Sequence, residues 1–291
     1  MDNLLTNYNR PSELDQRSYY LRGLIVESLE GARRGHIGSS LSLVETLRVL
    51  YDDFLSYHPE DPEWEERDRC ILSKGHGCLA LYAILADKGF FAKSELKTFC
   101  HHNSILGGHP EKGKIPGVEA STGALGHGLS IGVGIALAAR IKKRPFRTVV
   151  ITGDGELNEG SIWEAALACS KHELSNLTIF VDYNKLQCYG STKLVMNLEP
   201  LIQKWQSFGF ETVEVDGHDI KALQNIVSSL PFNKTRPSVI ICHTIKGKGF
   251  SFAENNPAWH YKHVITDEDI EKMKLCLNTF PNIYTQIDNN A

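Results

Sequence analysis

The chain has 291 residues, of which 42% are hydrophobic and 23% are charged, and its formal net charge is −4. This length predicts a globular protein of one or two domains, and the mild acidity argues against nucleic-acid binding. No apolar run approaches the ~18–20 residues of a membrane span and no signal-peptide pattern opens the chain, while seven cysteines without a Cys-x-x-Cys pair fit a reducing cytoplasm.

The first half of the chain is expected to form helices around one short strand. Apolar residues at helical spacing predict helices over residues 12–32 and 41–55. An apolar run predicts a strand over residues 69–73, and a helix over residues 78–88 should follow it. The glycine-rich stretch 120–128 opens a further helix that runs to about residue 143.

A strand–helix–strand unit follows and organises the rest of the sequence. A β-branched run predicts a strand over residues 148–152, with a helix over 161–172 and a second apolar strand over 177–181. Such a unit has parallel strands, so Asp154 and Asn184 should lie at the same edge of the sheet. Open α/β sheets bind ligands at this edge.

The residues at this edge favour a site for Mg²⁺ and a diphosphate. The carboxylate of Asp154 and the amide oxygen of Asn184 are hard oxygen donors that suit Mg²⁺. Gly153 and Gly155 flank the carboxylate and allow backbone amides to approach a phosphate closely. The alternative interpretation is an ordinary strand-turn-helix junction with a solvated Asp154.

The last third of the chain continues the alternation of strands and helices. A loop is expected over residues 190–200, and the remaining elements are helices over 201–208, 220–230 and 266–278 and strands over 211–215 and 238–242. His218 is assigned to a structural turn that caps the helix after it. Together the elements predict an α/β fold with a mostly parallel sheet, helices on both faces, and one domain over residues 1–291, ordered over about 10–280.

Three histidines are placed on turns rich in glycine. His36, His76 and His109 each have a glycine beside them or one residue away, which lets their rings face a cavity. Metal binding is the rival interpretation, but their spacings match no helical histidine pair and no zinc signature. Neutral histidines near pH 7 can both donate and accept protons.

Taken together, these motifs resemble the N-terminal, thiamine diphosphate-binding part of transketolase, over about residues 27–262. The motifs are Gly35-His36…Gly38, Ser73-Lys74-Gly75-His76, Gly108-His109-Pro110-Glu111, Thr122-Gly123-Ala124-Leu125-Gly126, Asp154 to Asn184, and Trp259-His260. The resemblance implies thiamine diphosphate and Mg²⁺ as cofactors, and transfer of a two-carbon ketol unit from a ketose, expected to be phosphorylated, to an aldose. Thiamine diphosphate supplies the carbanion stabilisation that this cleavage needs.

The resemblance also implies roles for individual residues. The histidines of the substrate channel, which bind hydroxyls and move protons, are His36, His76, His109 and His260. The residues expected to contact the cofactor are His76, Gly123, Leu125, Asp154, Gly155, Glu159, Asn184 and Lys246. The metal ligands are Asp154, Asn184 and the backbone carbonyl of Leu186. Glu159 and Glu164 match the carboxylates that connect paired active sites in the family, and Glu159 is also expected to be catalytic. Lys262 matches a second active-site lysine.

The sequence departs from the family at Ile37, His127 and Tyr261, which puts the substrate in doubt. The family's second domain, which supplies an activating glutamate, is expected on a separate partner chain. The resemblance therefore implies one subunit of a split transketolase, assembled as two copies of each chain. Two alternatives stay open: an α-type subunit of a 2-oxo acid dehydrogenase, and a non-catalytic binding or regulatory subunit with the same fold.

Overall fold

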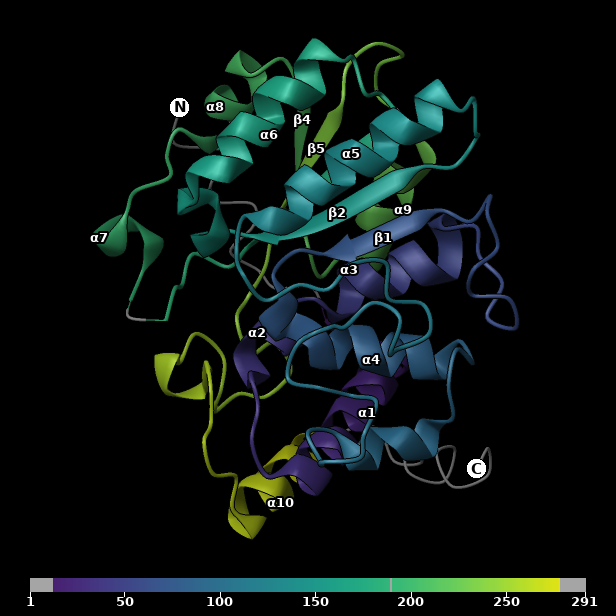
Figure 1. Ribbon diagram of the computed structural model, residues 1–291. Helices are drawn as coiled ribbons and strands as arrows, with labels where there is room; N and C mark the ends of the chain where they lie inside the picture. Colours follow the sequence, from purple (N-terminus) through teal and green to yellow (C-terminus); the bar gives the residue numbers. More distant parts are fainter. Residues whose placement is uncertain (1–12, 189, 278–291) are drawn as a thin grey trace.

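The computed structural model describes residues 13–188 and 190–277, and within them a five-stranded parallel sheet forms the centre of the molecule (Figure 1). The strand order is β1-β2-β3-β5-β4. The strands are β1 (Arg69–Leu72), β2 (Thr148–Gly153), β3 (Leu177–Tyr183), β4 (Glu211–Asp216) and β5 (Ser238–His243). The predicted α/β class is confirmed. The expected order of residues 10–12 and 278–280 lies outside the described residues.

The predicted strand–helix–strand unit is confirmed as β2, α6 (Gly160–Lys171) and β3. The two strands are parallel, in a register that runs from Thr148 opposite Leu177 to Gly153 opposite Asp182. Asp154 and Asn184 therefore follow directly at the same edge of the sheet. All the residues of β2 and β3 are buried, which explains their continuous apolar composition.

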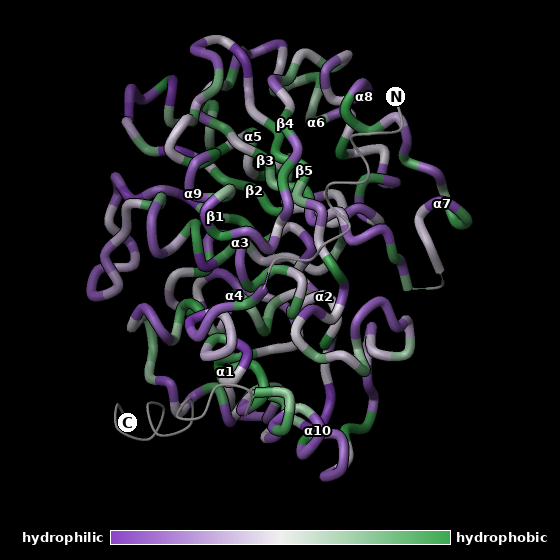
Figure 2. The backbone as a smooth tube through the Cα atoms, turned by 180° about the vertical axis from the view of Figure 1, so that it is seen from behind, coloured by the Kyte–Doolittle hydropathy of each residue, from purple (hydrophilic) through white to green (hydrophobic). Residues whose placement is uncertain are grey.

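Helices cover both faces of the sheet, and alternate strand residues divide between two apolar cores. On one face Val150, Ile179 and Ile241 pack with α5 (His127–Ile141), α6 and α8 (Leu201–Ser207). On the other face Val149, Phe180 and Ile240 belong to a core shared with the N-terminal helices. The inner strands β2, β3 and β5 are mostly hydrophobic in Figure 2.

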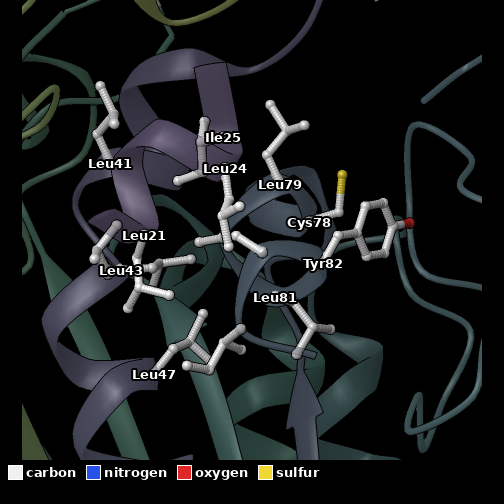
Figure 3. Packing of buried hydrophobic residues seen from close by; sticks show 14 of the residues in the cluster. Leu21, Leu24, Ile25, Leu41, Leu43, Leu47, Cys78, Leu79, Leu81 and Tyr82 are labelled. Carbon is white, nitrogen blue, oxygen red and sulfur yellow. The ribbon is translucent and has the colours of Figure 1, made fainter. Parts of the chain in front are cut away.

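The N-terminal helices and α10 build a second layer below the sheet in the view of Figure 1. The helices of this layer are α1 (Gln16–Ala32), α2 (Ile37–Leu41), α3 (Val44–Val49), α4 (Cys78–Asp87) and α10 (Asp267–Leu277). Helix α9 (Ile220–Ser228) contacts α3 and β4. Leu21, Leu24 and Ile25 of α1 pack against Leu43 and Leu79, and all five are almost fully buried (Figure 3). This packing fixes the turns that carry His36 and His76.

The expected helix over residues 41–55 is confirmed over residues 44–54, as α3 followed directly by a π-helical turn, Leu50–Phe54. It begins later than expected because a turn at Ser42 separates it from α2; the Ser42 hydroxyl bonds to Asp182 and to the carbonyl of Ser39, and such bonds compete with helical geometry. The prediction of a loop over residues 190–200 was wrong in part, since this stretch contains a short helix, α7 (Thr192–Val195). Within the described residues, no helix has the length and apolar character that crossing a membrane requires.

Candidate active site

A cavity of about 320 Å³ lies at the carboxyl ends of the strands. Its lining residues are His36, Ser39, Lys74, His76, His109, Gly123, Leu125, Gly153, Asp154, Gly155, Glu156, Asn184, Leu186, Gln187, Cys188, Lys246 and His260. Every residue that the sequence assigned to catalysis, cofactor or metal is in this set except Glu159. The volume lies within the range of small-molecule sites, and the lining comes from segments far apart in the sequence.

The four histidines are brought together on one side of this cavity. The ring centroid of His36 is 5.3 Å from that of His76, 6.0 Å from that of His109 and 5.5 Å from that of His260. A two-stranded backbone bridge between Gly35 and Lys262 joins the turns that carry His36 and His260. The resemblance predicted that these four histidines share one channel, and their convergence on one cavity is confirmed.

The electrostatic surroundings keep these histidines neutral. Burial and the charges of neighbouring residues lower the pKa of His36 to about 4 and that of His260 to about 3. Burial also lowers the pKa of His76 and His109. A neutral imidazole has one nitrogen that donates and one that accepts, so the cluster offers both functions to a polyol at neutral pH.

The glycine turn at Gly123 is required by the close approach of His109. Gly123 has φ of +146°, and a Cβ there would come within 3.1 Å of the His109 ring. A side chain at this position would therefore be strained, and the His109 ring would have to shift by a few tenths of an ångström. This explains physically why Gly123 and His109 occur together at the site.

Asp154, Asn184 and Leu186, the predicted metal ligands, also line the cavity. Asp154 accepts hydrogen bonds from the backbone N–H groups of Gly155 (2.7 Å) and Lys185 (2.5 Å). The amide oxygen of Asn184 accepts from the N–H of Leu186 at 3.1 Å. These groups are held by backbone amides, so the donor atoms are in place before any ligand binds.

The donor set fits a hard cation such as Mg²⁺. Within residues 13–188 and 190–277 there is no cluster of three or more His, Cys, Asp or Glu residues suited to a metal. A carboxylate, an amide oxygen and a backbone carbonyl are instead the hard donors that Mg²⁺ takes alongside phosphate oxygens. Burial and the nearby charge of Asp182 raise the pKa of Asp154 to about 6, and a bound cation would reverse this effect.

Two lysines line the cavity, and one is paired with a carboxylate whereas the other donates to a backbone carbonyl. Lys74 is buried and forms an ion pair with Asp182, which the sequence reasoning did not assign to the site. Lys246 donates from Nζ to the carbonyl of Leu186 at 2.7 Å. Burial and the charge of Lys74 lower the pKa of Lys246 to about 8.

Glu156 is a buried acid at the site that sequence reasoning also missed. It accepts hydrogen bonds from the hydroxyl of Ser73 and from the backbone N–H groups of Gly126 (2.9 Å) and Gly153 (3.1 Å). It therefore ties the turn after β1 to the turn after β2. The sequence signal that could have identified Glu156 is its position three residues after the end of a strand, in the first turn of a short helix.

Several residues named from the sequence lie outside the cavity. Glu159 and Glu164 are exposed, and neither lines the cavity. Lys262 lies over the ring of Trp259, with Nζ 4.4 Å from its centroid. His218 is buried and structural, as predicted, but it does not cap the helix: Asp219 does, while the Nδ1 atom of His218 lies 2.7 Å from Glu45.

Comparisons with known proteins agree with this geometry. The sequence profile of the transketolase thiamine diphosphate binding domain matches residues 15–289. The chain belongs to the transketolase family. The fold described above is therefore that of the family's thiamine diphosphate-binding domain.

Relatives of similar length are single subunits of transketolases. The chain is 42% identical over 248 residues to a subunit of the apulose-4-phosphate transketolase of Phocaeicola vulgatus, covering 85% of this chain and 88% of that protein. It is 41% identical to the 6-deoxy-6-sulfo-D-fructose transketolase subunit SqwG of a Clostridium species, covering 85% and 90%. The chain is a transketolase subunit of the same type as these relatives.

Full-length transketolases match over a shorter share of their own length. The human transketolase is 33% identical, and the chain covers 42% of it. A transketolase structure from Pichia stipitis superimposes with a TM-score of 0.84 at 32% identity, covering 91% of this chain and 41% of that one. The chain thus spans about two fifths of these longer proteins.

Proposed function

We propose that this chain is the thiamine diphosphate- and Mg²⁺-binding subunit of a two-chain transketolase. The observation that carries the proposal is the convergence of four neutral histidines and three oxygen donors on one cavity of about 320 Å³. Thiamine diphosphate supplies carbanion stabilisation when bound. The chain, proposed to be one domain over residues 1–291 and cytoplasmic, supplies the metal site, proton donors and acceptors, and part of the substrate channel.

The metal side is proposed to hold the diphosphate. Asp154, Asn184 and the carbonyl of Leu186 would be the protein ligands of Mg²⁺, with diphosphate oxygens completing the coordination. Gly123, Leu125 and Gly155 would contact the cofactor through backbone atoms that line the cavity. Lys246 would turn its ammonium from the Leu186 carbonyl toward the phosphate oxygens once a cation takes that carbonyl.

The histidine side is proposed to work on the sugar. His36, His109 and His260 would hold hydroxyl groups and transfer protons during cleavage and ligation, and His76 would act between substrate and diphosphate. A neutral imidazole accepts a proton at one nitrogen while it donates at the other, which suits both directions of the reaction. Glu159 stays a prediction as a residue connecting paired sites, since it is exposed.

The substrate is proposed to be a ketose with an anionic end. Two relatives are named for apulose-4-phosphate and 6-deoxy-6-sulfo-D-fructose, which share a terminal anion, a phosphate or a sulfonate. Because these relatives are themselves named as subunits, they support a partner chain, which is proposed to bring the remaining half of the active site. The proposed assembly has two copies of each chain. Such an assembly would bury an extensive surface, ~2,000 Å² or more.

A 2-oxo acid dehydrogenase α-type subunit is the competing function, and enzyme assays separate the two. The assembled protein is supplied with thiamine diphosphate, Mg²⁺ and either a ketose phosphate with an aldose acceptor or a 2-oxo acid with an electron acceptor. Transfer of a two-carbon unit without oxidation of the 2-oxo acid supports the proposal. Oxidative decarboxylation without ketol transfer would overturn it, and absence of both would favour a non-catalytic subunit.

A further inference from the structure

Asp182 is a buried carboxylate at the end of β3 that has no assigned role. Its side chain is buried and does not line the cavity. Four side chains from separate segments donate to it: Ser42 Oγ (2.7 Å), Asn184 Nδ2 (3.2 Å), Lys74 Nζ and Thr244 Oγ1. Because the three partners other than Asn184 hold the carboxylate in place, it presents a fixed acceptor to Asn184.

The hydrogen bond to Asp182 determines which way the amide of Asn184 points. Nδ2 of Asn184 donates to Asp182, and its Oδ1 accepts from the N–H of Leu186 at 3.1 Å. A flipped amide would set its oxygen against a carboxylate and its NH₂ against a backbone N–H. Both hydrogen bonds would be lost, and both new contacts would be repulsive.

We propose that Asp182 is a positioning residue for the metal site, because it holds the amide oxygen of Asn184, and not the NH₂ group, toward the cation. This proposal rests on the proposed function of Asn184 as a Mg²⁺ ligand. An amide NH₂ cannot bind a cation, so a flip removes one ligand and adds a donor in its place. Outer partners of metal ligands typically change metal affinity 10–100-fold when they are replaced.

The first test removes the acceptor and keeps the approximate shape of the side chain. Asp182→Leu should lower the affinity for Mg²⁺, measured by calorimetry at saturating thiamine diphosphate with the partner subunit present, by about 10–100-fold. Asp182→Asn is the matched control, since its amide oxygen can still accept from Nδ2 of Asn184; its affinity should lie closer to that of wild type than to that of Asp182→Leu. Equal affinity of folded Asp182→Leu and wild type would overturn the proposal.

A charge-conserving exchange separates orientation from loss of the buried charge. In Asp182→Asn/Asn184→Asp, residue 184 presents an oxygen in either orientation, and Lys74 keeps a nearby carboxylate. This double variant should bind Mg²⁺ within about threefold of wild type. If it is folded and binds as weakly as Asp182→Leu, orientation is not what Asp182 provides. If Asp182→Leu fails to fold, the Mg²⁺ affinity of the double variant still tests the proposal.

A structure of the wild-type Mg²⁺ complex gives a readout that needs no variant. Asn184 should keep its Nδ2 contact to Asp182 while Oδ1 faces the metal. An amide turned away from Asp182 in that complex would refute the inference. Failure of the wild type to bind Mg²⁺ with thiamine diphosphate would instead refute the proposed function, so the two failures are distinguishable.

Discussion

The ionised carboxylate of Asp154 should lower the free energy of unfolding of the metal-free protein, and Asp154→Asn should therefore stabilise it at neutral pH. Burial and the charge of Asp182 raise the pKa of Asp154 from 3.8 to about 6. This shift corresponds to about 3 kcal/mol of unfavourable free energy when the carboxyl group is ionised in the folded, metal-free protein. The isosteric amide cannot ionise and removes this term, although one of the two backbone N–H groups that bond to Asp154 loses an acceptor.

The sign follows from proton linkage. Because the folded-state pKa is the higher one, the proton on Asp154 stabilises the folded wild type fully below pH 3.8, and this stabilisation is lost as the pH rises through about 6. Asp154→Asn lacks this dependence. Its free energy of unfolding, relative to that of wild type, should therefore rise by about 1.4 kcal/mol between pH 5 and pH 8 without Mg²⁺.

Urea denaturation of both proteins at several pH values measures this difference. Asp61→Asn, at an exposed position, is the matched control for the loss of one carboxyl group. The same Asp154→Asn protein should no longer bind thiamine diphosphate in a Mg²⁺-dependent way. A stability difference that does not change with pH, or that changes in the opposite direction, would refute the reasoning that this carboxylate is held ready for a cation.

Three further predictions follow from the same structure. Affinity for thiamine diphosphate with Mg²⁺ should fall by up to about tenfold for each pH unit below about 6, since protons compete with the metal at Asp154, and calorimetry showing constant affinity down to pH 5 would contradict this. His260→Ala should lower kcat/KM for ketol transfer by about 10²–10⁴-fold with cofactor affinity within about threefold, whereas exposed His263→Ala should change neither; the reverse pattern counts against a role with substrate. Arg22→Met leaves a buried glutamate without its cation and should cost about 3–5 kcal/mol in urea denaturation, against about 0.5 kcal/mol or less for the exposed Arg236→Ala; equal losses would contradict the burial argument.

The sheet was predictable because its strands carry a strong local signal. The β-branched runs after Thr148 and Ser238 are buried on both faces, and such runs define a parallel strand closely. Asp154 and Asn184 could be placed together from this alone, because the ends of parallel strands share one edge. The helix break at Ser42 could not, since it depends on a hydrogen bond to Asp182, 140 residues away.

The buried charges of the site carry no local signal. Lys74 and Asp182 stand beside the motifs that the sequence analysis used, but their ion pair is formed only when β1 and β3 meet across β2. Resemblance pointed to Glu159, which is exposed, whereas the buried Glu156, three residues earlier, lines the cavity together with Asp154. The histidines could be proposed as a set, but their separations of 5–6 Å are a property of the tertiary fold.

Reconstitution of activity tests the central claim most directly. The chain is purified and supplied with Mg²⁺, thiamine diphosphate, a ketose phosphate and an aldose acceptor, with and without a candidate partner that carries the other half of a transketolase. The account predicts no turnover by the chain alone and ketol transfer on mixing, with loss of that transfer in Asp154→Ala. Full turnover by the isolated chain, or transfer that survives Asp154→Ala, would contradict it.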